Sequence, residues 1–226
     1  MTKAVLTISS KNYGAWALRG WLMAKLVELD FSEKVISPDD PAMRAEMLLL
    51  SSSIRVPALH HNGIDVWDTL AIAEYLAESF PDKHLWPADV QARARARSIC
   101  AEMHSGFVGL RSACPMNIEA SLPDVGRLIW RDQPGVRADV ARLCGLWGEL
   151  LAAQPAGSLL FGAFTVADAF FAPVCMRIRT YDLPVPADIR AYVDRVAALP
   201  GVKDWIDGAL AEQDFLDFEE PYRLGR

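Results

Sequence analysis

The spacing of apolar residues changes once along this chain, near Pro81, and this change constrains the fold most. Before it, short apolar runs alternate with stretches of helical periodicity; after it, long helical patterns follow one another. The first arrangement is typical of βαβ units and the second of a helical bundle. We therefore predict an α/β domain over residues 1–81, a linker over 82–87 and an all-helical domain over 88–226.

The first half is predicted to run β-α-β-α-β-β-α and to form a small mixed sheet. The expected elements are strands at Ala4–Ile8 and Phe31–Ile36, helices at Trp16–Leu29 and Ala42–Leu50, strands at Val56–His60 and Ile64–Trp67, and a helix at Leu70–Glu78. Asn62-Gly63 joins the last two strands and is a residue pair that two-residue hairpin turns prefer.

The second half shows helical periodicity without competing strand patterns. We expect helices at Val90–Leu110, Val136–Ala153, Val166–Tyr181, Ala187–Ala198 and Val202–Glu212. Thr165 and Asp168 have the spacing of a capping box, which we interpret as a folding element and not a catalytic one.

Composition excludes several function classes. The 226 residues carry a net charge of −6, spread evenly over both halves, and such a chain should repel nucleic acid. Four widely spaced cysteines, with no paired spacing, suggest neither a disulfide framework nor a zinc site. We find no membrane-spanning run and no secretory leader. These features favour a reduced, cytoplasmic protein with no metal, no membrane partner and no nucleic-acid partner.

Three polar motifs fall at the predicted ends of strands and helices. Val56-Pro57 begins a strand, where proline indicates an edge position or a special peptide bond. Asp68-Thr69 opens a helix and could simply cap it, or could hold the two charges of a free amino-acid end. The run from Ser9 to Tyr13 joins a strand to a helix N-terminus and is either a polar loop or an anion site. All three should meet at one end of the sheet.

The run SSIRVPALHHNGIDVWDTLAIAEYLAE, from Ser52 to Glu78, resembles the glutathione-binding segment of cytosolic glutathione transferases. FTVADAFFAPV, from Phe164 to Val174, is similar to the buried helix of their second domain. The resemblance covers nearly the whole chain and is strongest to the bacterial, serine-type and zeta-like members. It implies a thioredoxin-like domain followed by a helical domain, glutathione as co-substrate, a small hydrophobic electrophile and a homodimer.

The resemblance also implies roles for individual residues. Val56, followed by a cis Pro57, would hold the cysteinyl backbone of glutathione, and Asp68 and Thr69 its γ-glutamyl end. Ser9-Ser10 resembles the double serine that contacts the glutathione sulfur. About three extra residues precede the helix, so Ser9, Ser10, Asn12 and Tyr13 are all candidates, of which we favour Ser10. The remaining expected glutathione contacts are Trp16 and Arg55; Ile54 stands where the family often has glycine.

The electrophile should bind between the domains, beside the helix that begins at Val90. The residues expected to line this pocket are Met103, His104, Phe107, Arg111, Pro115 and Met116. The helical spacing of Met103, His104 and Phe107 favours the alternative that they are packed in the core, whereas Arg111 on an apolar face is less easily explained by packing. Arg177, Arg179 and Tyr181 either close the same cleft or pair with nearby acids.

The implied chemistry is activation of a thiol. A free thiol has a pKa near 8.5, and a hydroxyl at a helix N-terminus that lowers it by roughly two units supplies about 2.7 kcal/mol. The first cysteine is Cys100, so a cysteine nucleophile in the Ser9–Trp16 loop is excluded. His60-His61 is a poor metal pair, because neighbouring strand residues face opposite sides. The alternatives are a glutathione-dependent isomerase of the maleylacetoacetate type and a non-catalytic binding or scaffold protein.

Overall fold

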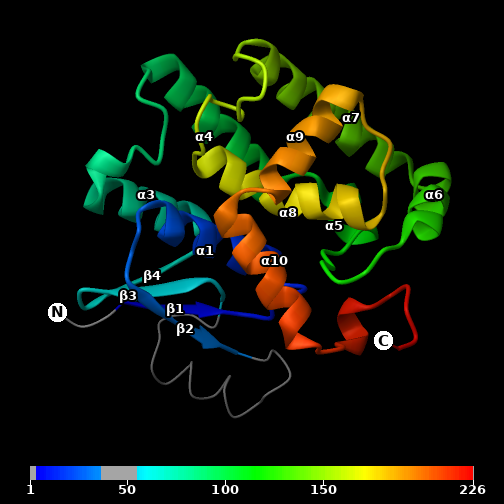
Figure 1. The fold of residues 1–226 in the computed structure, drawn as a ribbon, viewed down its shortest axis with the longest axis horizontal. Helices are drawn as coiled ribbons and strands as arrows, with labels where there is room; N and C mark the ends of the chain where they lie inside the picture. Colours follow the sequence, from blue (N-terminus) through cyan, green and yellow to red (C-terminus); the bar gives the residue numbers. More distant parts are fainter. Residues whose placement is uncertain (1–3, 37–54, 226) are drawn as a thin grey trace.

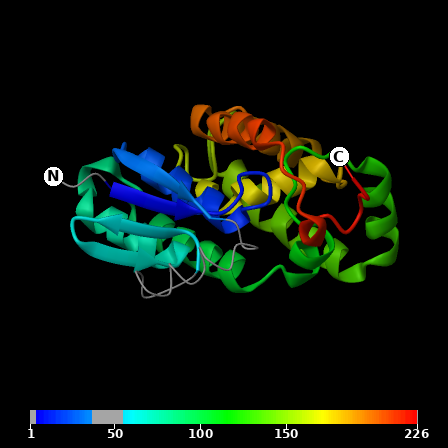
Figure 2. The same ribbon diagram turned by 90° about the horizontal axis from the view of Figure 1, so that it is seen from below.

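The computed structural model describes residues 4–36 and 55–225. A small sheet occupies one end of the molecule and a group of helices the other, with the chain termini far apart (Figures 1 and 2). The predicted helix at Ala42–Leu50, and Ile54, lie outside the described residues.

The sheet is mixed, as the sequence predicts, and its strand order is β2-β1-β3-β4. Strand β1 (Ala4–Ile8) runs parallel to β2 (Phe31–Val35) and antiparallel to β3 (Ala58–His61), which pairs with β4 (Ile64–Trp67). Asn62 and Gly63 both have positive φ, 53° and 78°, as a type I′ turn requires. The hairpin predicted from this dipeptide is confirmed.

Helices α1 (Ala15–Leu26) and α3 (Thr69–Ser79) lie between the sheet and the helical half (Figure 1). Gly20 on α1 faces Pro57, the residue before β3. A Cβ atom at Gly20 would lie 2.7 Å from Pro57 Cγ, closer than any real contact. Glycine at this position therefore allows α1 to pass directly beside the Val56-Pro57 segment.

The second half is helical, as predicted. Its helices are α4 (Val90–Ser105), α5 (Val108–Ala113), α6 (Pro123–Asp132), α7 (Pro134–Ala152), α8 (Val166–Thr180), α9 (Ala187–Ala197) and α10 (Pro200–Glu212). Short 3-10 turns lie at Pro81–Lys83 (η1) and Asp217–Glu219 (η2). Helix α8 is buried along almost its whole length and packs against α1, α4 and α9. None of the described helices is long and apolar enough to cross a membrane.

One predicted helix, Val90–Leu110, is wrong because it is two helices. Gly106 ends α4, and Phe107 follows in the left-handed region with a φ of 54°. This conformation interrupts the helix before α5 begins at Val108. Helix α6 was not predicted. The capping box at the start of α8 is confirmed: Asp168 Oδ2 accepts from the Thr165 backbone, and Asp168 Oδ1 accepts from the Leu160 N–H and the Tyr192 hydroxyl.

Candidate functional site

Two adjoining cavities lie where the sheet domain meets the helical half. The first cavity, about 470 Å³, is lined by Trp16, Arg55, Val56, Pro57, Asp68, Thr69 and His104. The second cavity, about 410 Å³, is lined by the loop before α1, the first turns of α1, the α5 region, Arg177 and Glu219. Trp16 and Val56 line both cavities, so the two cavities adjoin at these residues.

Val56 offers backbone groups to a ligand. The Val56-Pro57 bond is cis, as the resemblance implies. Within the described parts of the chain, neither the N–H nor the C=O of Val56 has a hydrogen-bond partner. An extended peptide lying across both cavities can pair with these groups as a neighbouring strand would.

Asp68 and Thr69 lie in the first cavity at the N-terminus of α3. Asp68 has a φ of 75°, and its Oδ1 accepts from the Leu70 N–H at 2.8 Å, so it caps the helix. His104 comes from α4 to the same place. Its Nε2 lies 3.2 Å from Asp68 Oδ2 and its Nδ1 3.5 Å from Thr69 Oγ1. His104, which the sequence analysis expects in the electrophile pocket, lines the first cavity and lies against the Trp16 ring.

Ser10 is held by a carboxylate from the far end of the sequence. Its hydroxyl donates to Glu212 Oε2 at 2.7 Å, and the Lys11 N–H donates to Glu212 Oε1 at 2.7 Å. The Asn12 N–H in turn donates to Ser10 Oγ at 3.1 Å. Ser10 is buried and does not line either cavity. Glu212, at the end of α10, was not anticipated from sequence.

The side chains of Tyr13 and Asn12 also form hydrogen bonds within the protein. The Tyr13 hydroxyl donates to Glu220 Oε1 at 2.6 Å, and burial, reinforced by this hydrogen bond, raises the pKa of Tyr13 to about 12. Asn12 Oδ1 accepts from the Glu119 N–H at 2.9 Å. Asn12 Nδ2 has no partner but is sealed from solvent. Tyr13 lines the second cavity, but its hydroxyl proton is already used in the hydrogen bond to Glu220, and Asn12 does not line that cavity.

Ser9 differs from the other three candidates in its hydrogen bonding. It lines the second cavity, as Tyr13 does, but its hydroxyl has no partner among the described residues. Helix α1 begins beside it: Gly14 is the N-cap residue and provides no side-chain cap. A Cβ at Gly14 would lie 2.6 Å from Ser9 Oγ, so glycine here leaves room for the hydroxyl. A free hydroxyl and an uncapped helix N-terminus therefore meet in this cavity, an arrangement that stabilises an anion.

Three arginines line the second cavity: Arg19 from α1, Arg111 from α5 and Arg177 from α8. Burial, with the positive charges of Arg177 and Arg111, lowers the pKa of Arg19. Burial and Arg111 likewise lower the pKa of Arg177 to about 10, which still leaves it protonated near neutral pH. Arg19 and Arg111 stack on the Trp16 ring, with Cζ atoms 4.2 and 5.1 Å from its centre. Sequence reasoning singled out Arg111, on an apolar face, but not Arg19.

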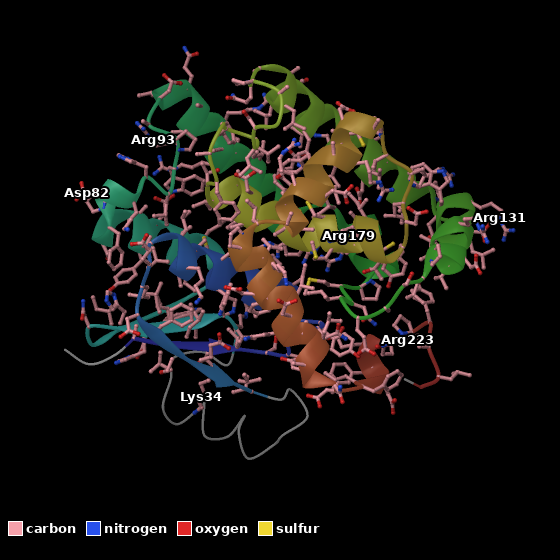
Figure 3. The ribbon with its side chains drawn as sticks, in the orientation of Figure 1. Lys34, Asp82, Arg93, Arg131, Arg179 and Arg223 are labelled. Atoms are coloured by element: carbon pink, nitrogen blue, oxygen red, sulfur yellow. The ribbon has the colours of Figure 1, made fainter. Side chains whose placement is uncertain are left out.

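The other expected electrophile-pocket residues are divided. Met116 and Pro115 line the second cavity with Arg111. Met103 on α4 and Phe107, just before α5, do not line it: both are buried in the core. Arg179 is exposed and lines a separate hollow with Ile206; Figure 3 shows it on α8. Tyr181 is buried and donates to the Pro115 carbonyl at 3.1 Å.

The cysteines and the histidine pair take no part in this site. Cys100, Cys114 and Cys175 are buried, and burial raises the pKa of each thiol. His60 Nδ1 lies 2.7 Å from Asp65 Oδ1, whereas His61 Nδ1 lies 2.9 Å from the Tyr75 hydroxyl. The two histidines thus have separate partners. Over residues 4–36 and 55–225 no cluster of histidine, cysteine and carboxylate side chains could hold a metal ion.

Known proteins share both halves of the chain. Family models described as glutathione S-transferase, N-terminal domain and glutathione S-transferase, C-terminal domain match residues 13–79 and 91–208. Glutathione S-transferase 1 of Dianthus caryophyllus is 29% identical over 206 residues, covering 89% of this chain and 84% of that protein. A probable maleylacetoacetate isomerase of Caenorhabditis elegans is 25% identical over 208 residues, covering 84% and 92%.

Solved structures show the same fold. The crystal structure of a glutathione transferase homolog from Burkholderia, with bound glutathione, superposes with a TM-score of 0.69 at 24% identity. The match covers 92% of this chain and 98% of that one. The expected fold class, a thioredoxin-like domain followed by a helical domain, is confirmed.

Proposed function

Because the chain belongs to the glutathione S-transferase family, we propose that it binds glutathione across the two cavities and activates the thiol for attack on a small electrophile. The observation that carries the proposal is the pairing of a free Ser9 hydroxyl with the uncapped N-terminus of α1 in the second cavity. A thiolate is the anion that this arrangement would stabilise.

The proposed pose of glutathione is based on the groups that line the first cavity. The free N–H and C=O of Val56 pair with the cysteinyl backbone, which places the sulfur at the boundary of the two cavities. The γ-glutamyl ammonium lies near the Asp68 carboxylate, and its carboxylate accepts from Thr69 and the α3 N-terminus. His104 Nε2 lies 3.2 Å from Asp68 Oδ2. When glutathione binds, His104 would therefore either move away from Asp68 or share this carboxylate with the γ-glutamyl ammonium.

Ser9, and not Ser10, is the proposed thiol-contacting residue. The Ser10 hydroxyl already donates a hydrogen bond to Glu212, so it can donate to the glutathione sulfur only if that bond is broken. Ser9 has no such bond to break. Its hydroxyl donates to the thiolate, and the first free N–H groups of α1 add their positive charge. The proton leaves to solvent, the sulfur bonds to an electrophilic carbon, and a leaving group departs or a conjugated double bond takes up a proton.

Isomerisation is the second candidate, favoured by the maleylacetoacetate isomerase among the similar proteins. In this reaction the same thiolate adds to a conjugated double bond, the carbon–carbon bond rotates, and the thiolate leaves again. Glutathione is consumed by a transferase and regenerated by an isomerase. Measuring the glutathione balance during turnover of a conjugated cis-diacid therefore separates the two activities.

Glutathione binding is the first test, because a scaffold protein would fail it. Ligand at 100 times its Kd stabilises the folded state by about 2.7 kcal/mol. We expect a rise in melting temperature at millimolar glutathione that Thr69→Ala weakens. No rise in the wild-type protein would exclude both enzyme activities. The homodimer and the boundaries at residues 81 and 88 are part of the same proposal, and sedimentation velocity and limited proteolysis check them.

A further inference from the structure

The arginines of the second cavity have more hydrogen-bond donors than the fold uses. Arg19 donates through Nε to the Phe170 carbonyl at 2.8 Å. Arg177 donates through Nε to the Cys114 carbonyl at 2.8 Å and through Nη1 to the Pro173 carbonyl at 3.3 Å. Arg111 donates through Nη1 to the carbonyls of His104 and Gly106 at 3.4 and 3.2 Å. A guanidinium has five N–H donors, so each of the three retains donors that these bonds leave free.

The unused donors face the cavity. Arg19 and Arg177 are 1% and 6% exposed, so little of either side chain reaches the outer surface. Every side-chain nitrogen of Arg19 and Arg177 either has a hydrogen-bond partner or is in contact with solvent-accessible space. Because both side chains line the second cavity, their unpaired N–H groups open into that cavity.

The charges in this cavity do not balance. Within the described residues, none of the three arginines forms an ion pair with a carboxylate. Glu219 is the carboxylate that lines the cavity with them, and burial raises its pKa while Arg177 opposes that rise. Among the described lining residues, three guanidinium groups share the cavity with one carboxylate, which is costly. Burial and the neighbouring arginines accordingly lower the pKa values of Arg19 and Arg177. A bound anion would offset this cost.

We propose that the second cavity binds an electrophile that carries a carboxylate, held by Arg111, Arg177 and Arg19 beside the Ser9 hydroxyl. This inference rests on the proposed function and replaces the expected hydrophobic electrophile with an anionic one. The carboxylate pairs with the guanidinium groups in a bidentate manner. Its reacting carbon then faces the sulfur of glutathione, whose γ-glutamyl end occupies the first cavity. A cavity of about 410 Å³ limits the substrate to a small acid.

A matched pair of aryl halides tests the charge preference. In 4-chloro-3,5-dinitrobenzoate and its methyl ester the same carbon reacts: the glutathione thiolate forms a C–S bond, the C–Cl bond breaks, and chloride leaves. Each enzymatic kcat/KM is divided by the uncatalysed rate constant with glutathione, which removes the difference in intrinsic reactivity. Loss of a charged hydrogen bond corresponds to roughly ten- to hundredfold. We expect the acid to be preferred by at least about tenfold.

Variants then assign the preference to the arginines. Arg111→Gln and Arg177→Met should each lower the normalised kcat/KM for the acid by a larger factor than that for the ester, and Arg111→Lys should restore part of the preference for the acid. Arg179→Gln is the matched control, because Arg179 lies on the same helix as Arg177 but lines another hollow. A circular dichroism melt confirms that Arg177→Met is folded before it is assayed.

Binding supplies a readout that does not depend on turnover. Calorimetric titration of the acid and the ester into the protein with S-methylglutathione present should give the acid the tighter Kd, weakened by Arg111→Gln. Equal affinities and equal normalised rates for acid and ester would overturn the proposal while leaving the transferase proposal intact. A rise in the KM for glutathione alone in Arg111→Gln would also overturn it, because the arginines would then serve glutathione itself. Absence of glutathione binding would instead refute the proposed function.

Discussion

The carboxylate of Glu212 should fix the loop that carries both serines. Glu212 closes α10 and accepts from the Ser10 hydroxyl and the Lys11 N–H, both at 2.7 Å, and from the Asn12 N–H at 3.3 Å. Hydrogen bonds to a charged group contribute about 1.5–3 kcal/mol each. Counting the two short bonds, and discounting for partial exposure, we expect Glu212→Ala to lower the free energy of unfolding by about 2–4 kcal/mol.

The same substitution should impair catalysis more than glutathione binding. The loop positions Ser9 and the start of α1, whereas Val56, Asp68 and Thr69 lie on other elements. We expect kcat to fall by at least about tenfold, with the Kd of glutathione changed far less. Urea unfolding and steady-state kinetics measure the two effects. Asp207→Ala is the control: Asp207 lies on the same helix and pairs with the exposed Lys203, so its loss should scarcely change the free energy of unfolding. Equal effects of the two substitutions would refute the role assigned to Glu212.

Two further perturbations test how the scaffold positions the site. Gly20→Ala places a Cβ 2.7 Å from Pro57 Cγ, so the Val56-Pro57 segment must shift and the Kd of glutathione should rise. Gly148→Ala, in open space on α7, is the control and should leave this Kd unchanged. Identical Kd values in the two variants would contradict this reasoning. Burial raises the pKa of Asp168 to about 6, so the folded state binds the extra proton and stability falls as pH rises from about 4 to 6, by about 3 kcal/mol. Urea unfolding of wild type and Asp168→Asn across this range should give curves that diverge by that amount, and parallel curves would contradict the assignment.

Local sequence signals predicted those parts of the fold that depend on neighbouring residues. Asn62-Gly63 requires positive φ at both positions and adopts it. Thr165 and Asp168, three residues apart, form the expected capping box. The break at Gly106 was missed because apolar spacing continues through Phe107, and nothing in the periodicity shows that this residue enters the left-handed region.

The identity of the free serine could not be predicted, because it depends on a residue 202 positions away. Ser9 and Ser10 are adjacent and chemically identical in sequence. Glu212 engages Ser10 and leaves Ser9 unpaired, and this pairing exists only after α10 has packed against the sheet domain. The arginine cluster has the same origin, since α1, α5 and α8 each contribute one side chain. The carboxy-terminal segment adds Glu220, which holds Tyr13 and pairs with Arg223 near the end of the chain (Figure 3).

The central claim is that the Ser9 hydroxyl, at the N-terminus of α1, stabilises the thiolate of bound glutathione. The most direct measurement is a pH titration of the ultraviolet absorbance of the thiolate in the protein–glutathione complex. We expect the wild-type complex and Ser10→Ala to show a thiol pKa roughly two units below the free value of about 8.5, and Ser9→Ala to return toward it. A thiol pKa unchanged by Ser9→Ala but raised by Ser10→Ala would contradict the account and assign the role to Ser10.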